Sequence, residues 1–201
     1  MSNHCPCGNL RAVLWAKSRF SPISNNRDEV HSNQKYITIV NYYYSVWGIL
    51  KFPIIKAENL NKEEVEIPSQ LTGNPKLLIV PFQQWQQRVV DSWIPFLTQL
   101  TNDFPGFDFY ELPTIRKMNF VYRRFIDGGM RAGIPSRDTR RRTVTLYIDK
   151  EPFKEVLNIT TEDTIHLFLI DSQGNVTWYE NGEVTRDKAE SLTKAITQML
   201  D

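Results

Sequence analysis

Cysteine is almost missing from this chain of 201 residues, which holds only Cys5 and Cys7, one residue apart near its start. No disulfide framework can therefore staple the body of the protein, and its stability must come from packing. His4 completes an H-C-P-C cluster with these cysteines. Structural zinc needs four ligands at hairpin spacings and only three candidates are present, so we predict no metal site here.

The chain also lacks an excess of positive or negative charge. The 24 Lys and Arg residues face 23 Asp and Glu residues, which leaves a net charge of +1. No global field then recruits nucleic acid or acidic lipid, and any electropositive partner site must be local. Hydrophobic residues make up 41% of the chain and aromatic residues 12%, enough to form a sizeable core and to argue against wholesale disorder.

Acidic residues are absent before Asp28, whereas arginine, lysine and serine occur among apolar residues there. Such composition is typical of a mitochondrial transit peptide, and the features of a secretory signal are missing. We therefore predict that residues 1–30 are a transit peptide or, alternatively, a disordered tail that is basic by chance.

A long hydrophobic run is also missing. Residues 36–50 carry no charge, but Asn41, three tyrosines and Gly48 argue against a membrane-spanning helix and favour a strand or an interfacial segment. Charged residues broken by Pro68 and Gly73 follow. We therefore expect residues 31–70 to be an extension and connector, and the folded domain to cover residues 71–201.

The first half of this domain alternates between strand and helix periodicity. Residues 76–82 form a continuous apolar run typical of a strand buried on both faces. Residues 86–102 predict an amphipathic helix, with Pro95 implying a kink or an interrupted end. Residues 107–112 predict a second strand. A further helix, expected to end at Gly128-Gly129, is marked by Ile115, Met118, Tyr122, Phe125 and Ile126.

The second half continues with a strand at 143–149 and a short helix at 151–157. A hairpin follows, in which 165–171 and 176–179 flank a turn containing Gly174. Thr185 can cap a last helix. This order predicts an α/β thioredoxin-like fold: a central mixed β-sheet flanked by helices, with the strand and helix at 143–157 as an insertion.

The residues of thioredoxin redox chemistry are missing from this fold. Such enzymes carry Cys-x-x-Cys at the start of the helix after the first strand, where the helix terminus lowers the pKa of the attacking thiol. When Trp85 is placed before the motif, Gln86 and Val89 fall at the two thiol positions. The proline that redox members hold in cis should fall near Ile165, yet no proline follows Pro152. Both losses argue against a redox enzyme.

Over roughly residues 70 to 200 the chain resembles the mitochondrial ATP synthase assembly factor family called "ATP ten", which is thioredoxin-like without the redox pair. The order and spacing of several short pieces carry this resemblance; they are Asp91–Phe96, Arg140–Arg142, Leu146–Asp149 with Phe153, Leu167–Asp171 with Gly174 and Trp178, and Gly182.

The resemblance implies a factor of the mitochondrial inner membrane that faces the matrix. It would bind newly made subunit a, also called subunit 6, and aid its incorporation into the Fo sector without catalytic turnover. Membrane contact would be peripheral or loosely anchored.

One basic cluster and one tryptophan are the candidate partner-binding residues. The cluster lies in a stretch punctuated by Gly and Pro, which predicts either a solvated loop or a site for acidic lipid headgroups or an acidic partner. It comprises Arg131, Arg137, Arg140, Arg141 and Arg142. Trp178 is either a core residue or an exposed interface anchor.

No catalytic constellation and no glycine-rich phosphate loop are found, so we expect neither an enzyme nor a cofactor. His166 is interpreted as a hydrogen-bonded core residue. Two alternatives stay open: an oxidoreductase of thioredoxin or peroxiredoxin type that has lost its thiols, and a scaffold that binds anionic lipid or nucleic acid through the arginines. Nucleic acid is not the expected partner, because no recognised motif accompanies the arginines.

Overall fold

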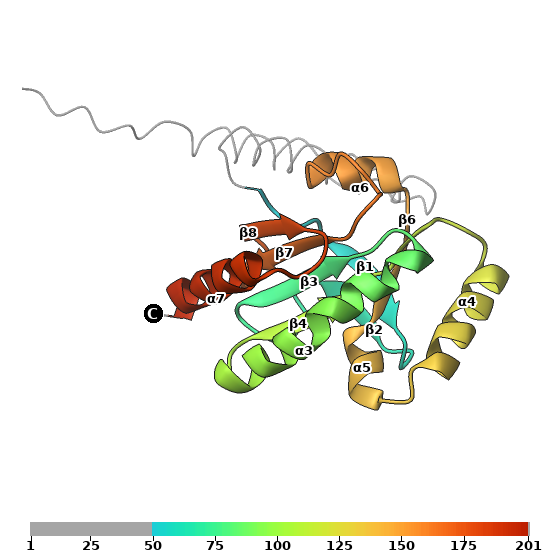
Figure 1. Ribbon diagram of the computed structural model, residues 1–201. Helices are drawn as coiled ribbons and strands as arrows, with labels where there is room; N and C mark the ends of the chain where they lie inside the picture. Colours follow the sequence, from blue (N-terminus) through green and yellow to red (C-terminus); the bar gives the residue numbers. More distant parts are fainter. Residues whose placement is uncertain (1–49, 201) are drawn as a thin grey trace, which may run out of the picture. The chain divides into compact units, whose positions relative to one another are not determined.

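The computed structural model describes residues 50–200, which lie within one compact unit. Figure 1 shows the elements of this unit coloured along the sequence. The predictions of a transit peptide at 1–30 and of a strand or interfacial segment at 36–50 fall, but for Leu50, outside the described residues.

The central sheet contains four strands in the order β4-β3-β7-β8. β3 (Lys76–Val80) pairs in parallel with β4 (Asp108–Glu111) and antiparallel with β7 (His166–Ile170). β8 (Val176–Asn181) completes the hairpin with β7, and Gly174 in its turn has φ of +82°. Every residue of β3 and β7 is buried, which explains why all of them except Lys76 and His166 are apolar.

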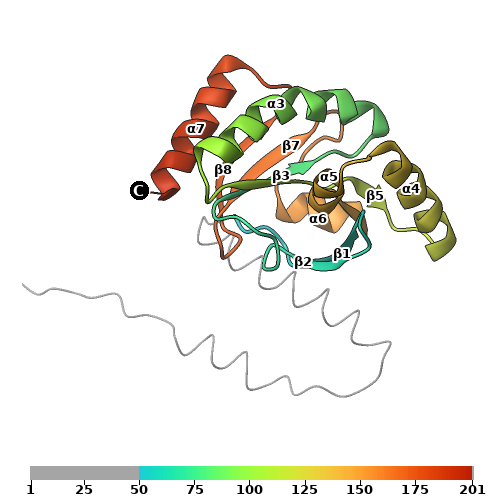
Figure 2. The same ribbon diagram turned by 90° about the horizontal axis from the view of Figure 1, so that it is seen from below.

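Both faces of the central sheet are covered. On one face, α3 (Gln87–Asp103) and α7 (Arg186–Leu200) pack against Leu77 and Leu169, and Figure 2 shows these two helices on the same side. The other face carries a second core, in which Leu78 and Phe168 are joined by residues of the second sheet. α3 runs through Pro95 without a break, so the interrupted end is not observed.

The second sheet contains the strands β2-β1-β6-β5. β1 (Ile55–Asn59) pairs antiparallel with β2 (Glu64–Ile67) and with β6 (Val144–Ile148), which in turn pairs in parallel with β5 (Thr114–Arg116). A single parallel bridge between Glu111 and Thr143 links the two sheets.

The expected domain start near Leu71 is therefore wrong. Phe52 and Ile67 are fully buried in the same core as Leu78, and Asn59 pairs with Val144 across β1 and β6. Sequence analysis missed the hairpin because its strands have only five and four residues and carry charged residues between their inward positions. Such short charged segments resemble a solvated connector.

Two helices differ from the prediction. α4 (Phe120–Gly133) begins after Asn119, whose side chain accepts a hydrogen bond from the Tyr122 amide, and it continues through Gly128-Gly129. Ile115 lies in β5 and not in this helix. The predicted arginine loop contains α5 (Arg137–Arg142), which is capped by the Ser136 hydroxyl.

The inserted strand and helix are confirmed as β6 and α6 (Lys150–Val156). The central order, in which β3-α3-β4 is followed by β7-β8-α7 with β4 and β8 at the edges, defines a thioredoxin-like α/β fold. The predicted fold class is thus confirmed.

Candidate functional site

The position that the sequence assigns to the first redox thiol is occupied by a structural glutamine. Gln86 ends the 3-10 helix η1 (Gln84–Gln86) and is fully buried. Its Oε1 accepts hydrogen bonds from the amides of Phe82 at 2.7 Å and Gln83 at 3.2 Å, and its Nε2 donates to the Glu162 carbonyl at 2.6 Å. Val89, at the second thiol position, is buried as well. These side chains secure the start of α3 and provide no nucleophile.

His166 is the hydrogen-bonded core residue that the sequence predicted. Its Nδ1 lies 2.8 Å from the Tyr179 hydroxyl and its Nε2 lies 2.9 Å from the Thr161 carbonyl oxygen. Burial lowers the pKa of the imidazole. Both ring nitrogens are thus committed to structural contacts.

Two of the predicted site arginines contact one buried carboxylate, Asp108. Arg141 Nη2 donates to Asp108 Oδ2 at 3.2 Å, and Arg141 Nη1 donates to the Tyr110 hydroxyl at 3.0 Å. Arg142 Nε lies 3.0 Å from Asp108 Oδ1 as an ion pair without hydrogen-bond geometry, while its guanidinium sits 4.7 Å from the ring centroid of Phe109. We call Asp108, Tyr110, Arg141 and Arg142 the Asp108 cluster.

The other three predicted arginines lie in different surroundings. Arg140 holds the β1–β2 turn to the segment before α5, because its Nε donates to Asn61 Oδ1 and its Nη1 donates to the Ile134 and Pro135 carbonyls. Arg137 is exposed at the start of α5, and Arg131 lies in the last turn of α4. The five arginines therefore have different partners: two contact Asp108, and Arg140 joins the β1–β2 turn to the segment before α5.

Trp178 is partly buried against the core and is not a fully exposed side chain. It contacts the core beneath α7, and its Nε1 donates to the Ser191 hydroxyl at 3.0 Å. The alternative of a core residue describes this tryptophan better than that of an exposed anchor.

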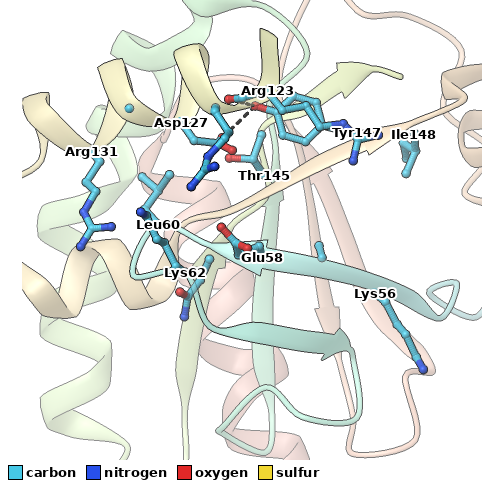
Figure 3. A pocket seen from close by; sticks show the side chains of 14 residues that line it. Lys56, Glu58, Leu60, Lys62, Arg123, Asp127, Arg131, Thr145, Tyr147 and Ile148 are labelled. Carbon is cyan, nitrogen blue, oxygen red and sulfur yellow. Dashed lines mark hydrogen bonds between the residues drawn. The ribbon is translucent and has the colours of Figure 1, made fainter. Parts of the chain in front are cut away.

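A groove of about 630 Å³ lies between α4 and the outer face of β1 and β6. Among its lining side chains are five cations and two carboxylates. The cations are Lys56, Lys62, Arg123, Arg124 and Arg131, and the carboxylates are Glu58 and Asp127. Figure 3 shows Arg131 and Lys62 toward one end of the groove and Lys56 toward the other. We call this feature the basic groove.

The wall of the basic groove is fixed by a tyrosine. The Tyr147 hydroxyl donates to Asp127 Oδ1 at 2.7 Å, and the guanidinium of Arg123 lies 4.9 Å from the Tyr147 ring centroid (Figure 3). Burial, followed by the hydrogen bond to Asp127, raises the pKa of Tyr147 well above its ordinary value. The tyrosine thus stays protonated and holds α4 against β6.

Thr145, which also lines the groove, is 3% exposed, and its Oγ1 has no hydrogen-bond partner among residues 50–200. Arg131 was singled out from the sequence, but the rest of the groove was missed. Its residues come from three separate segments, and no local motif joins them.

Residues 50–200 contain no group of side chains that could hold a metal ion. In the same range, no helix is both long enough and apolar enough to span a bilayer.

The fold and the filled thiol positions together define a thioredoxin-like protein without the redox pair. The sequence matches the ATP10 protein family over residues 25–199. The chain therefore belongs to this family of ATP synthase assembly proteins. The match begins well before residue 70, where the resemblance in the sequence was thought to start. No curated protein sequence matches the chain.

Several solved structures are similar to this chain at low identity. A thiol:disulfide interchange protein of the thioredoxin family from Chlorobium tepidum is 15% identical, with a TM-score of 0.45 over 76% of this chain and 97% of its own. A DsbF homologue from Corynebacterium diphtheriae is 14% identical, with a TM-score of 0.49 over 75% and 87%. BsSco, a member of the Sco family of cytochrome c oxidase assembly proteins, is 13% identical, with a TM-score of 0.48 over 74% and 95%.

Proposed function

We propose that this protein is a non-enzymatic assembly factor of the mitochondrial ATP synthase that binds newly made subunit a, also called subunit 6, and aids its incorporation into the Fo sector. It acts on the matrix side of the inner membrane. The observation that carries this proposal is membership of the ATP10 family over most of the chain.

Binding without turnover suffices for this role. An unassembled membrane subunit exposes apolar surface and intramembrane charges that its neighbours later cover. A partner that binds this state lowers the population available for aggregation or proteolysis. The burial of Gln86 and Val89 supports a binding role, because neither thiol position retains a group that could exchange disulfides.

The client is tested by immunoprecipitating the tagged protein from mitochondria during pulse-labelling of organelle-encoded products. We expect to recover newly made subunit a. In a deletion strain we expect assembled Fo to be depleted while the catalytic sector still forms. Normal subunit a levels and a fully coupled synthase in that strain would contradict the proposal.

The absence of redox activity needs its own test. The full chain carrying Cys5→Ser and Cys7→Ser has no thiol left, and we expect the unchanged chain to be as inactive as this variant in a thiol–disulfide exchange assay. Turnover by the unchanged chain that the variant lacks would favour the oxidoreductase alternative and would assign the activity to the amino-terminal cysteines.

A further inference from the structure

The outward side of α4 is apolar, and within the described range, residues 50–200, its large hydrophobic side chains are exposed. Val121, Tyr122 and Phe125 are 74%, 64% and 82% exposed, and their spacing places them on one side of the helix. Phe125 is the most exposed large hydrophobic side chain in the described part of the protein. Tyrosine and phenylalanine at the surface of a helix are costly in water and typical of contact with an interface.

The opposite flank of α4 forms the wall of the basic groove. Arg123, Arg124 and Arg131 project from this helix into the groove lining, and Lys62 approaches from the β1–β2 turn. Neither Lys62 nor Arg131 forms an ion pair with any of residues 50–200. The groove therefore has a surplus of positive charge, although the whole chain is nearly neutral.

The groove also contains an unused hydrogen-bonding group. Buried hydroxyl groups nearly always have a partner, but the Oγ1 of Thr145 has none among residues 50–200 and so can still donate a hydrogen bond. A hydroxyl beside arginine and lysine can donate to a phosphate oxygen, and arginine binds phosphate in a bidentate manner.

We propose that the basic groove binds the phosphate headgroup of an anionic phospholipid while the side of α4 that carries Val121, Tyr122 and Phe125 enters the membrane surface. Arg131 and Lys62 pair with the phosphate, and the Thr145 hydroxyl donates to it. This inference rests on the proposed function, for which it names the surface that meets the inner membrane.

The helix α4 combines cations with an exposed apolar side. This combination favours an anionic lipid surface over a soluble phosphate or an apolar protein segment. A free phosphate or a soluble phosphate ester would use the groove but would leave Phe125 in water. An apolar protein segment would cover Phe125 but would leave Arg131 and Lys62 unpaired. A lipid surface satisfies both, as in interfacial amphipathic helices whose polar face is rich in arginine and lysine.

The test is flotation of the full-length protein with vesicles. We expect binding to phosphatidylcholine vesicles that contain about one-fifth cardiolipin, and little binding to phosphatidylcholine alone. The double variant Lys62→Ala/Arg131→Ala should weaken binding about 25-fold, because each cation at an anionic surface contributes about fivefold. Phe125→Ser should weaken binding to the same vesicles by about tenfold or more.

Matched controls lie elsewhere on the protein. Arg88→Ala removes an exposed charge from α3, and Trp85→Ser removes an exposed aromatic side chain outside α4. We expect both to bind as the unchanged protein does. Circular dichroism and thermal unfolding would confirm that every variant is folded.

Four results would overturn the inference. The first is no binding to cardiolipin vesicles, and the second is an equal loss for Arg88→Ala and Lys62→Ala/Arg131→Ala. The third is full competition by millimolar glycerol phosphate, which would indicate a site for soluble phosphate. The fourth is loss of subunit a recovery in the groove variants with unchanged vesicle binding, which would indicate a protein interface. Failure to recover subunit a with the unchanged protein, alongside normal vesicle binding, would instead contradict only the proposed function.

Discussion

Two regions of this protein are rich in arginine, and they use the charge in opposite ways. In the Asp108 cluster, Arg141 and Arg142 contact a buried carboxylate that also meets the hydroxyls of Thr72 and Tyr110. In the basic groove, Arg131 has no ion-pair partner among the described residues.

The difference teaches that a count of arginines does not locate a binding surface. A guanidinium that is held by a buried carboxylate stabilises the fold, and another ligand could recruit it only by breaking that pair. A cation that faces solvent has no such contact to lose, so it is free to bind a partner. Substitutions in the Asp108 cluster should therefore change stability, and those in the basic groove should change binding.

The largest effect of a substitution is expected for Asp108→Ala. This change leaves Arg141 and Arg142 with the exposed Asp138 as their only carboxylate partner among residues 50–200 and removes an acceptor for Thr72. Removal of one partner of a fully buried ion pair costs about 3–5 kcal/mol, but Arg141 and Arg142 are 34% and 22% exposed, so we expect a smaller loss of about 2–3 kcal/mol. Urea unfolding of the full chain would measure the loss.

The control for this prediction is Asp138→Ala. Asp138 also pairs with both arginines, but its side chain is 58% exposed. Exposed pairs contribute at most about 1 kcal/mol. Equal losses for the two variants would show that Asp108 has no special role in stability.

Glu111, a carboxylate that forms no ion pair with any of residues 50–200, provides the second prediction. Burial, helped by the charge of Asp91, raises the pKa of Glu111 to about 7. The folded protein then binds a proton more tightly than the unfolded chain, where the group keeps its ordinary pKa of 4.5, so stability falls as pH rises from about 4.5 to 7. We expect this loss to be about 3 kcal/mol, at about 1.4 kcal/mol for each pKa unit of the shift.

The measurement is the difference in unfolding free energy between the unchanged protein and Glu111→Gln across that pH range. His166 titrates in the opposite sense, because burial lowers its pKa and stability rises with pH through its titration. It is present in both proteins and cancels in the difference. A difference that does not change between pH 4.5 and 7 would contradict the prediction.

Sequence periodicity predicted the central sheet because its determinants are local. The continuous apolar run that became β3, the helical stripe of α3 and the glycine turn between β7 and β8 each lie within a few residues. The β1–β2 hairpin was not predicted because its strands are short, and charged residues such as Lys56 and Glu58 made the segment resemble a connector.

The candidate site could not be predicted in the same way because its contacts join distant parts of the chain. Asp108 lies 33 residues from Arg141, and nothing near either residue signals the pair. The basic groove needs the β1–β2 hairpin, α4 and β6 together. Of the residues that line the groove, the sequence singled out only Arg131, as one of five candidate partner-binding arginines.

A third prediction compares two arginines of the same predicted cluster. Arg140→Ala removes hydrogen bonds to Asn61 and to two carbonyls, so we expect a loss of about 1–2 kcal/mol. Arg131→Ala removes no such contact within residues 50–200 and should change stability by less than about 0.5 kcal/mol. Thermal unfolding would separate the two, and equal effects would mean that Arg131 contributes to the fold.

The smallest effect on stability is expected when threonine is replaced by valine at two positions, Thr72 and Thr145. The Thr72 hydroxyl lies 2.8 Å from Asp108 Oδ2 and 2.7 Å from the Tyr110 hydroxyl, so Thr72→Val should cost about 1 kcal/mol. The Thr145 hydroxyl is buried without a partner among the described residues, so Thr145→Val replaces an unsatisfied polar group by a methyl group. Stability should then stay the same or rise by up to about 1 kcal/mol, while binding to anionic vesicles weakens. Destabilisation by Thr145→Val equal to that by Thr72→Val would show that the hydroxyl already has a partner in the free protein, and the contrast between the paired cluster and the open groove would be lost.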